Sequence, residues 1–459
     1  MKKKIVIPYE IYSSEFNGAL CLANVFLKNG WTVYLGQKQQ LFPYVKYFNK
    51  SVWYLKSIVP GEISILKKIK KAGHFIASCD NEMLTPNPLG PLGIQARYSA
   101  ETVKIADVIF FWGENHLKEF NKVFPKNEEK FFCTGSQILD SWKKMLSVST
   151  IKDKNKLLIT TSLSLSNSYK QTDQVGLMKD NFKELLNEKH IKLLNVIYIT
   201  QKRVKEKYVE LLKEINQNLN DSFEIILRPH PAENINFWIE LCRDFKKKIN
   251  IDNKSSLSEQ IKVSNYVIHF ASTLSNQIRI ADSISIYYPS LKESVLKTCF
   301  NINVSKISYN INDPKVLVKK LNNHEFEKHE KQKILSEVAE GFYSKEDLYS
   351  SNKIFNIIKE RFDKPKDNFD PFSFSAIFGY LDYNLRNYIG NILGNYFSFI
   401  PYFQKRFGLQ KNRMGKQNYK WRDITSKELN NLFINLKLNQ NIKIKKHASG
   451  FFKIDLNEK

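Results

Sequence analysis

The sequence is poor in the residues that build disulfide frameworks and metal sites. Five cysteines are scattered over its 459 residues. They are odd in number and lack the CxxC spacing that is typical of zinc sites. No cluster of histidines supplies metal ligands in their place. We therefore expect reduced, mostly buried thiols, and an activity that needs neither a metal nor another cofactor.

Long apolar runs are also scarce. No stretch approaches the ~20 apolar residues that a membrane-spanning helix needs. The opening residues 1–8 contain too few apolar side chains for a signal peptide and instead predict a first strand. A hydrophobic content of 42% and an aromatic content of 13% exclude global disorder. We expect a folded, cytoplasmic protein.

Acidic residues are few relative to basic ones: 46 Asp and Glu against 71 Lys and Arg give a formal charge of +25. Such a surface suits nucleic acid, anionic lipid or an acidic polymer. The alternative is a genome bias towards Lys, Asn and Ile, with most lysines on ordinary solvated surface. No RRM, zinc-finger or helix-turn-helix pattern accompanies the charge, so nucleic acid is not an expected partner.

Strands and helices alternate along most of the chain. In the first 145 residues, apolar runs predict strands at 4–8, 31–35, 74–78, 106–112 and 131–133, with helices such as 14–27 and 63–72 between them. The pattern restarts after a charged, serine-rich hinge at 147–156, with strands at 157–160, 224–228, 266–270 and 283–288. This alternation predicts an α/β fold with two parallel sheets. Two such units joined by a hinge enclose a cleft, as in the two-Rossmann architecture of GT-B glycosyltransferases, which other enzymes share.

The expected domain boundaries follow from this pattern and from a change of composition near residue 363. Residues 1–146 and 147–362 are each expected to form a Rossmann-like domain. The likeness to GT-B glycosyltransferases implies that the first is the acceptor-side domain and the second the nucleotide-sugar-binding domain. Residues 363–459 form a mostly helical extension, aromatic-rich over 370–403 and without acidic residues between Lys405 and Asp423. Segment 371–422 can lie on an anionic membrane, at the inner face of the plasma membrane; packing on the core or against another subunit is the alternative. Residues 425–428 resemble a capping box that opens a final helix.

One predicted strand of the second domain ends in cationic groups that suit a phosphate. The run 224–227 leads to Arg228 and His230, which Pro229 and Pro231 hold in a restricted backbone. His230 is expected to donate a proton or a hydrogen bond to a departing phosphate. Arg228 and Pro231 are expected to line the site that binds the phosphate-bearing donor substrate. Arg228 supplies positive charge to the phosphate. The alternatives are a histidine that merely packs at a strand end and a salt bridge between Arg228 and Glu233.

A second predicted strand leads to a cluster of hydroxyls. The run 266–270 is followed by Ser272, Thr273 and Ser275, placed to cap a helix that begins near residue 274. Hydroxyls and backbone N–H groups at a helix N-terminus bind anions, and ligands of open α/β sheets lie beyond the carboxyl ends of the strands. We expect a nucleotide phosphate there, with Thr161 and Ser162 as further lining residues. Plain capping of the helix is the alternative.

Taken together, these landmarks resemble bacterial surface-carbohydrate biosynthesis proteins related to polysialyltransferases and capsule Kdo transferases. The resemblance covers residues 3–350 and depends on ordered motifs: Ile7-Pro8-Tyr9-Glu10, Leu35-Gly36, Phe111-Trp112-Gly113, Thr134-Gly135, Arg228-Pro229-His230-Pro231 and Ser272-Thr273. It implies a GT-B fold, a CMP-activated acidic sugar as donor, a glycan or glycolipid as acceptor, and no metal.

The resemblance also locates an acidic motif, in which a carboxylate pair precedes a glycine. Here Asn81 stands in place of the second acid and Met83 in place of the glycine. We expect Glu82 to be the general base that deprotonates the acceptor hydroxyl, with Asp80 as the next candidate. Capping and binding of a backbone amide in the loop 85–91 are the alternatives. Gln277 stands where relatives often carry a glutamate that binds ribose, and its amide can still bind a hydroxyl.

The expected function is therefore transfer of a sialic-acid-like (nonulosonic) or Kdo-type sugar from its CMP ester to a surface-glycan acceptor. A CDP-glycerol or CDP-ribitol type transferase is the nearest alternative, since such enzymes also place phosphates against His-Pro and Ser/Thr elements. A non-catalytic scaffold that binds nucleotide or glycan is another, because the acidic motif is degraded.

Overall fold

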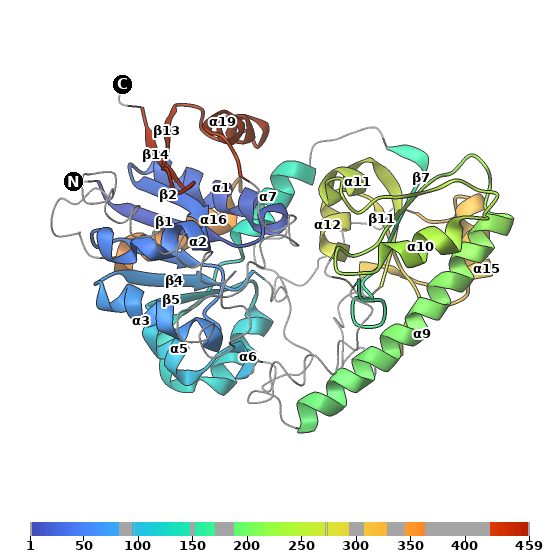
Figure 1. Cartoon of the computed structure of the whole chain (residues 1–459), viewed down its shortest axis with the longest axis horizontal. Coiled ribbons are helices and arrows are strands. Elements are labelled where there is room, and N and C mark those ends of the chain that lie inside the picture. Colours follow the sequence, from blue (N-terminus) through green and yellow to red (C-terminus); the bar gives the residue numbers. More distant parts are fainter. Residues whose placement is uncertain are drawn as a thin grey trace, which may run out of the picture. The chain divides into compact units, whose positions relative to one another are not determined.

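The computed structural model describes residues 2–81, 94–95, 97–146, 152–169, 188–270, 272, 274–292, 307–327, 344, 346–362 and 423–457 (Figure 1). By its contacts the chain divides into two compact units. The first comprises Met1–Leu84, Arg97–Ser141 and Ser336–Lys459, and the second comprises Thr85–Ala96 and Trp142–Leu335. Each unit has its own β-sheet.

The first unit is built on an eight-stranded sheet in the order β13-β14-β2-β1-β3-β4-β5-β6. Strands β1 to β6 are parallel to one another. They are β1 (Lys4–Tyr9), β2 (Thr32–Gln37), β3 (Val52–Leu55), β4 (Phe75–Cys79), β5 (Val108–Phe111) and β6 (Phe131–Cys133). Between them lie α1 (Tyr12–Lys28), α2 (Lys38–Leu41), η1 (Phe42–Tyr47), η2 (Pro60–Glu62), α3 (Ile63–Lys71), α5 (Ala100–Ile105), α6 (Glu114–Val123) and η3 (Pro125–Lys130), and α7 (Gln137–Leu146) follows β6.

Strands β1 to β6 of the first sheet are apolar because most of their side chains are buried in the core. All four residues of β3 are buried, and Ile5 and Val6 of β1 have no exposed surface. Helix α1 ends at Lys28 with Asn29 as its C-cap, and Gly30 follows with a φ of 78°, a conformation that glycine adopts without strain. The helix predicted at 14–27 is thus confirmed, and its C-terminal end lies one residue beyond the predicted one. Strand β3 was not predicted, because a run of four apolar residues has too little periodicity to identify it.

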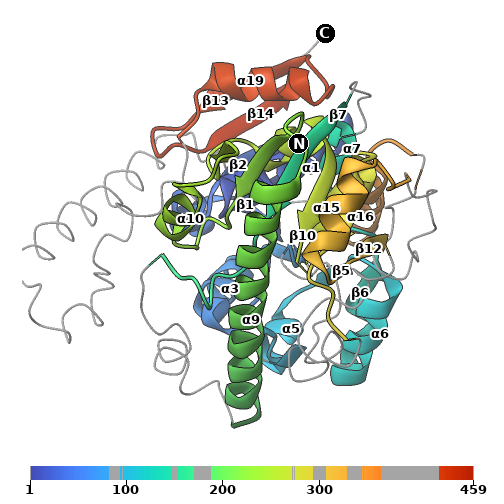
Figure 2. The ribbon, with the colours of Figure 1, turned by 90° about the vertical axis from the view of Figure 1, so that its right-hand side faces the viewer.

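The second unit is built on a six-stranded parallel sheet in the order β12-β11-β10-β7-β8-β9. Its strands are β7 (Asp153–Thr160), β8 (Glu224–Arg228), β9 (Ile249–Ile251), β10 (Ser264–His269), β11 (Ile284–Tyr287) and β12 (Tyr309–Asn310). Its helices include α9 (Glu188–Asn218), α10 (Ile235–Cys242), α11 (Leu257–Val263), α12 (Leu274–Ile280) and α15 (Pro314–Asn322). Strand residues such as Leu157 and Ile268 share one core with Tyr208 of α9 and Trp238 of α10. Figure 2 shows α9 beside α15. The predicted α/β alternation with two parallel sheets is confirmed.

One helix lies in a different unit from the one expected. Helix α16 (Tyr349–Arg361) falls within the range assigned to the second domain, yet it belongs to the first unit. Phe355 packs edge-to-face on Phe26 of α1, with ring centroids 5.0 Å apart, and lies 6.2 Å from the ring of Trp31. The boundary at residue 362 was wrong in this respect, because the pairing of two apolar faces far apart in the sequence leaves no local pattern.

The last described residues extend the first sheet. Thr425 and Glu428 cap α19 (Ser426–Asn435) reciprocally, so the predicted capping box is confirmed. Strands β13 (Ile442–Lys446) and β14 (Phe452–Leu456) form an antiparallel hairpin, and β14 pairs antiparallel with β2. This hairpin was not predicted. Segment 371–422 lies outside the described residues. Within the described parts of the chain, no helix combines the length and the apolar character that crossing a membrane requires.

Candidate functional site

The second sheet brings most of the predicted donor-binding residues to one edge. Strand β7 lies between β8 and β10. Because the three strands are parallel, the segments that follow them leave the same edge of the sheet. Thr161 follows β7, Arg228 ends β8 and is followed by His230, and Ser272 follows β10. This carboxyl edge is where open α/β sheets bind ligands.

His230 lies in a tight turn and its side chain is exposed at the surface. Its Nδ1 accepts a hydrogen bond from the backbone N–H of Ala232 at 3.1 Å. In the neutral ring the proton is therefore on Nε2, which is left as a donor. Desolvation by the surrounding groups lowers the pKa of His230; the carboxylate of Glu233 opposes this shift and Arg228 adds to it. Pro229 is buried and Pro231 is exposed.

Arg228 contacts neutral acceptors. Its Nη1 donates to the carbonyl oxygen of Ser255 at 2.7 Å and to Oε1 of Gln260 at 2.8 Å. Gln260 in turn donates to Asp252 Oδ2 at 3.0 Å. The expected alternative, a salt bridge to Glu233, is not formed, because Glu233 is surrounded by other donors. The charge of Arg228 is thus held in a fixed place, and no carboxylate of the described residues contacts it directly.

Glu233 was not predicted to be a site residue, yet it joins the two segments. Its side chain is 2% exposed. Its carboxylate accepts from Thr161 Oγ1 at 2.8 and 2.9 Å, and from the backbone N–H of Leu163 at 2.8 Å. Trp238 Nε1 donates to it at 3.1 Å. The hydroxyl of Thr161, expected on a ligand, is therefore directed to Glu233, whereas the neighbouring Ser162 is exposed.

The hydroxyls after β10 shape the start of α12. Ser272 Oγ accepts from the backbone N–H of Leu274 at 3.2 Å, as the capping alternative predicts. Ser275 is fully buried and its Oγ donates to the carbonyl oxygen of Ser272 at 3.0 Å. Gln277 is half-buried on α12. Thr273 lies outside the described residues. Ser272 and Gln277 thus retain some exposed surface, and Ser275 serves the turn.

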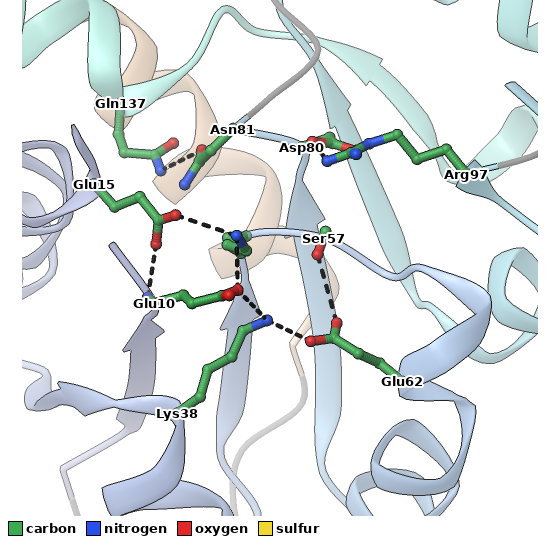
Figure 3. A network of polar contacts seen from close by, with 10 residues as sticks. Glu10, Glu15, Lys38, Ser57, Glu62, Asp80, Asn81, Arg97 and Gln137 are labelled. Carbon is green, nitrogen blue, oxygen red and sulfur yellow. Dashed lines mark hydrogen bonds and ion pairs between the residues drawn. The ribbon is translucent and has the colours of Figure 1, made fainter. Parts of the chain in front are cut away.

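In the first sheet, Asp80 lies at the carboxyl end of β4 and is buried. Arg97 binds both of its oxygens, with Nη2 2.7 Å from Oδ1 and Nε in contact with Oδ2. Tyr98 donates to Oδ2 at 2.8 Å, and Trp112 Nε1 donates to the backbone oxygen of Asp80 at 2.7 Å. Figure 3 shows the pair of Asp80 and Arg97. These contacts show that Asp80 holds Arg97, Tyr98 and Trp112 at the end of β4. Glu82, the favoured base, lies outside the described residues.

The residue that replaces the second acid of the motif has a defined partner. Asn81 Oδ1 accepts from Gln137 Nε2 at 3.1 Å, and Gln137 Oε1 accepts from Tyr54 at 2.6 Å. Asn81 therefore connects the end of β4 to the start of α7 through neutral hydrogen bonds (Figure 3).

Sequence reasoning missed a cluster of five charged side chains at the same edge of the first sheet (Figure 3). Lys56, after β3, lies 2.8 Å from Glu10 Oε2 and 3.3 Å from Glu15 Oε1. Lys38, after β2, lies 3.3 Å from Glu10 Oε2 and also contacts Glu62. We call these residues the Lys–Glu cluster. A signal was present, since Glu10 and Lys56 each follow an apolar run directly and Lys38 lies three residues after the run that ends at Leu35.

In the Lys–Glu cluster, the pKa of Glu10 is lowered and the pKa of Glu15 is raised. Desolvation raises the pKa of Glu10, but contacts with Lys56 and Lys38 outweigh it, and the pKa falls to about 2. Desolvation raises the pKa of Glu15, which is 3% exposed, against the opposing charge of Lys56. The side chain of Glu10 is 28% exposed, so Glu10 is the more accessible acceptor for a ligand hydroxyl. Among the described residues, no three His, Cys, Asp or Glu side chains are grouped so that they could hold a metal ion.

No protein-family model and no curated protein matches the sequence. Among solved structures, the chain is similar to a protein from Listeria monocytogenes assigned as a UDP-N-acetylglucosamine 2-epimerase, with a TM-score of 0.50 and 11% identity over 80% of this chain and 100% of that chain. The chain has a GT-B-like α/β fold. Two further similarities are weaker. The UDP-GlcNAc 2-epimerase of Methanocaldococcus jannaschii has a TM-score of 0.47 and 13% identity over 78% of this chain and 100% of that chain. The wall teichoic acid polymerase TagF has a TM-score of 0.42 and 14% identity over 78% of this chain and 90% of that chain.

These likenesses concern the fold alone. The expected GT-B-like architecture is confirmed. The finer resemblance to polysialyltransferases and Kdo transferases stays a prediction, since none of the three structures is such an enzyme.

Proposed function

We propose that the protein is a glycosyltransferase that moves a nonulosonic or Kdo-type sugar from a CMP-activated donor to a glycan or glycolipid acceptor. The observation that supports it best is the set of polar groups that follow three adjacent parallel strands of the second sheet. His230 and Arg228 lie at the end of β8, Thr161 follows β7, and Ser272 follows β10. A nucleotide phosphate suits this edge.

The chemistry on the donor side needs a group that stabilises the departing phosphate. Nε2 of His230 carries the proton of the neutral ring and donates a hydrogen bond to a phosphate oxygen of the leaving CMP, while the proton stays on the ring. Arg228 adds positive charge; its hydrogen bonds go to neutral oxygens, and the carboxylate of Asp252 acts on it through space. The sugar carbon loses its bond to the phosphate oxygen as the acceptor oxygen bonds to it.

The chemistry on the acceptor side needs a carboxylate. Glu82 is the proposed base, as the family motif implies. Asp80, held by Arg97 and Tyr98, keeps the end of β4 in place. Glu10 of the Lys–Glu cluster, with its lowered pKa, is a weak base and instead accepts a hydrogen bond from an acceptor hydroxyl.

A second candidate is an enzyme that acts on a UDP-sugar. It is favoured by the similarity to the Listeria monocytogenes protein assigned as a UDP-N-acetylglucosamine 2-epimerase, which this chain covers completely. Such an enzyme would also place its nucleotide at the carboxyl edge of the second sheet.

Nucleotide binding distinguishes these candidates. The melting temperature of the full chain is measured with CMP, UDP, CDP-glycerol and single-stranded DNA, each alone. The transferase proposal predicts stabilisation by CMP that the His230→Ala variant reduces. Stabilisation by UDP alone would favour the second candidate. Stabilisation by CDP-glycerol alone would favour a CDP-glycerol-type transferase. A response to DNA alone would contradict all three.

A further inference from the structure

Glu233 occupies an unusual place between the two segments that follow β7 and β8. Backbone hydrogen bonds already join these segments: Thr161 N donates to Arg228 O at 3.2 Å, Tyr169 N to Ala232 O at 3.1 Å, and Asn234 N to Asn167 O at 2.8 Å. The buried carboxylate of Glu233 lies between them. It is the acidic group to which both segments donate hydrogen bonds.

Three groups around this carboxylate can only donate. The backbone N–H groups of Leu163 and His230 lie 2.8 and 3.3 Å from Oε1, and Trp238 Nε1 lies 3.1 Å from Oε2. Thr161 and Asn167 complete the shell, the latter with Nδ2 3.4 Å from Oε2. A glutamine at position 233 has one oxygen and one NH2 group. Either orientation of this amide places its NH2 group against an obligate donor, so a carboxylate suits the shell better than its closest isostere.

The same residue also fixes the turn that carries His230. Glu233 N donates to the carbonyl oxygen of His230 at 2.8 Å, while His230 N donates back to the carboxylate. The ring of His230 is held through Nδ1 by Ala232, inside this turn. Displacement of the Glu233 side chain therefore moves the backbone on which the imidazole is mounted.

We propose that Glu233 is a positioning residue: it locks the loop 161–169 to the His230 turn and sets the place and the protonation of the imidazole at the phosphate side of the site. The role of the imidazole on a phosphate rests on the proposed function. A purely structural role is the competing explanation, in which Glu233 stabilises the fold and leaves the imidazole unaffected.

The titration of the imidazole separates these explanations. The 1H–13C signals of the histidine Cε1–H groups are followed against pH, and His230 is identified by its absence in His230→Gln. The charged groups that act on this ring are Glu233, which raises its pKa, and Arg228, which lowers it. In Glu233→Gln the pKa of His230 is expected to fall below its wild-type value, whereas Glu233→Asp retains the charge and keeps the pKa closer to wild type. The matched control is Glu240→Gln, an exposed carboxylate on α10, which leaves His230 unchanged.

Amide exchange and ligand binding complete the test. Exchange in 161–169 is expected to be faster in Glu233→Gln and Glu233→Asp, and unchanged in Glu240→Gln. CMP binding, measured by calorimetry, is expected to weaken about tenfold in Glu233→Gln. If Glu233→Gln is too unstable to study, the Asp variant supplies the exchange result and CMP affinity. A wild-type pKa of His230 in Glu233→Gln, or wild-type exchange of 161–169 in both variants, would overturn the proposal. Failure of the wild type to bind CMP or UDP would count against the proposed function only, because titration and exchange need no ligand.

Discussion

The carboxyl edges of the two sheets differ in the partners of their charged side chains. In the first sheet, Lys38 and Lys56 are buried and each contacts carboxylates directly. In the second sheet, Arg228 contacts neutral oxygens, and the buried Glu233 is surrounded by neutral donors. Positive charge is therefore in direct contact with carboxylates at the first edge, whereas the direct partners of Arg228 at the second edge are neutral. This difference favours a phosphate at the second edge and a hydroxyl-bearing ligand at the first.

The largest effect on folding is expected from Lys56→Met. This change removes the cation that Glu10 and Glu15 share. The buried Glu15 loses its lysine partner, whereas the more exposed Glu10 keeps its contact with Lys38. Removal of one partner of a buried ion pair typically costs about 3–5 kcal/mol. The free energy of unfolding in urea measures it.

The matched control is Lys122→Met, whose partner Glu119 lies one helical turn away on the exposed face of α6. That variant is expected to stay within about 0.5 kcal/mol of wild type, because exposed pairs contribute little. Equal losses in both variants would show that the Lys–Glu cluster is no more important than a surface pair.

The next largest effect concerns turnover. His230→Ala is expected to reduce the rate of sugar transfer from a CMP donor by roughly 10²-fold, because the leaving phosphate loses its donor. The rate constant at saturating donor is the measurement. Wild-type turnover in this variant would remove His230 from the mechanism.

The third-largest effect concerns the loss of folding stability at low pH, to which Glu10 at the carboxyl edge of the first sheet is expected to contribute. The pKa of Glu10 falls from 4.5 to about 2 on folding, so its ionised form stabilises the native state above the unfolded pKa. This contribution is lost as the pH falls from about 4.5 to about 2, whereas the raised pKa of Glu15 acts in the opposite direction. Glu10→Gln is expected to flatten the loss of stability in this window, as followed by urea unfolding at several pH values. An unchanged slope would show that Glu10 is not the group responsible.

The smallest effect is expected at the C-terminal addition to the first sheet. Thr425→Ala removes the cap of α19, which typically costs about 1 kcal/mol. Thermal unfolding of the full chain checks it. Ser426→Ala, on the first turn of the same helix, is the control. No difference between the two variants would mean that the end of α19 does not contribute to the stability of the unit.

Local patterns predicted the parts of this molecule that depend on neighbours in sequence. Apolar runs located β1, β2, β4, β5, β6, β7, β8, β10 and β11, and the capping box located α19. They could not reveal that α16 packs on α1 or that β14 pairs with β2, since those contacts join residues more than 300 positions apart. The hydrogen bond from Thr161 to Glu233 could not be predicted for the same reason, because the two residues meet only when β7 and β8 pair.

The central claim is that a nucleotide binds at the carboxyl edge of the second sheet. Amide hydrogen exchange of the full chain with and without CMP tests it most directly. We expect CMP to slow exchange in 161–169 and 228–234 and to leave the residues around Lys38 and Lys56 unchanged. Protection confined to the first unit, or no protection at saturating CMP, would contradict the account.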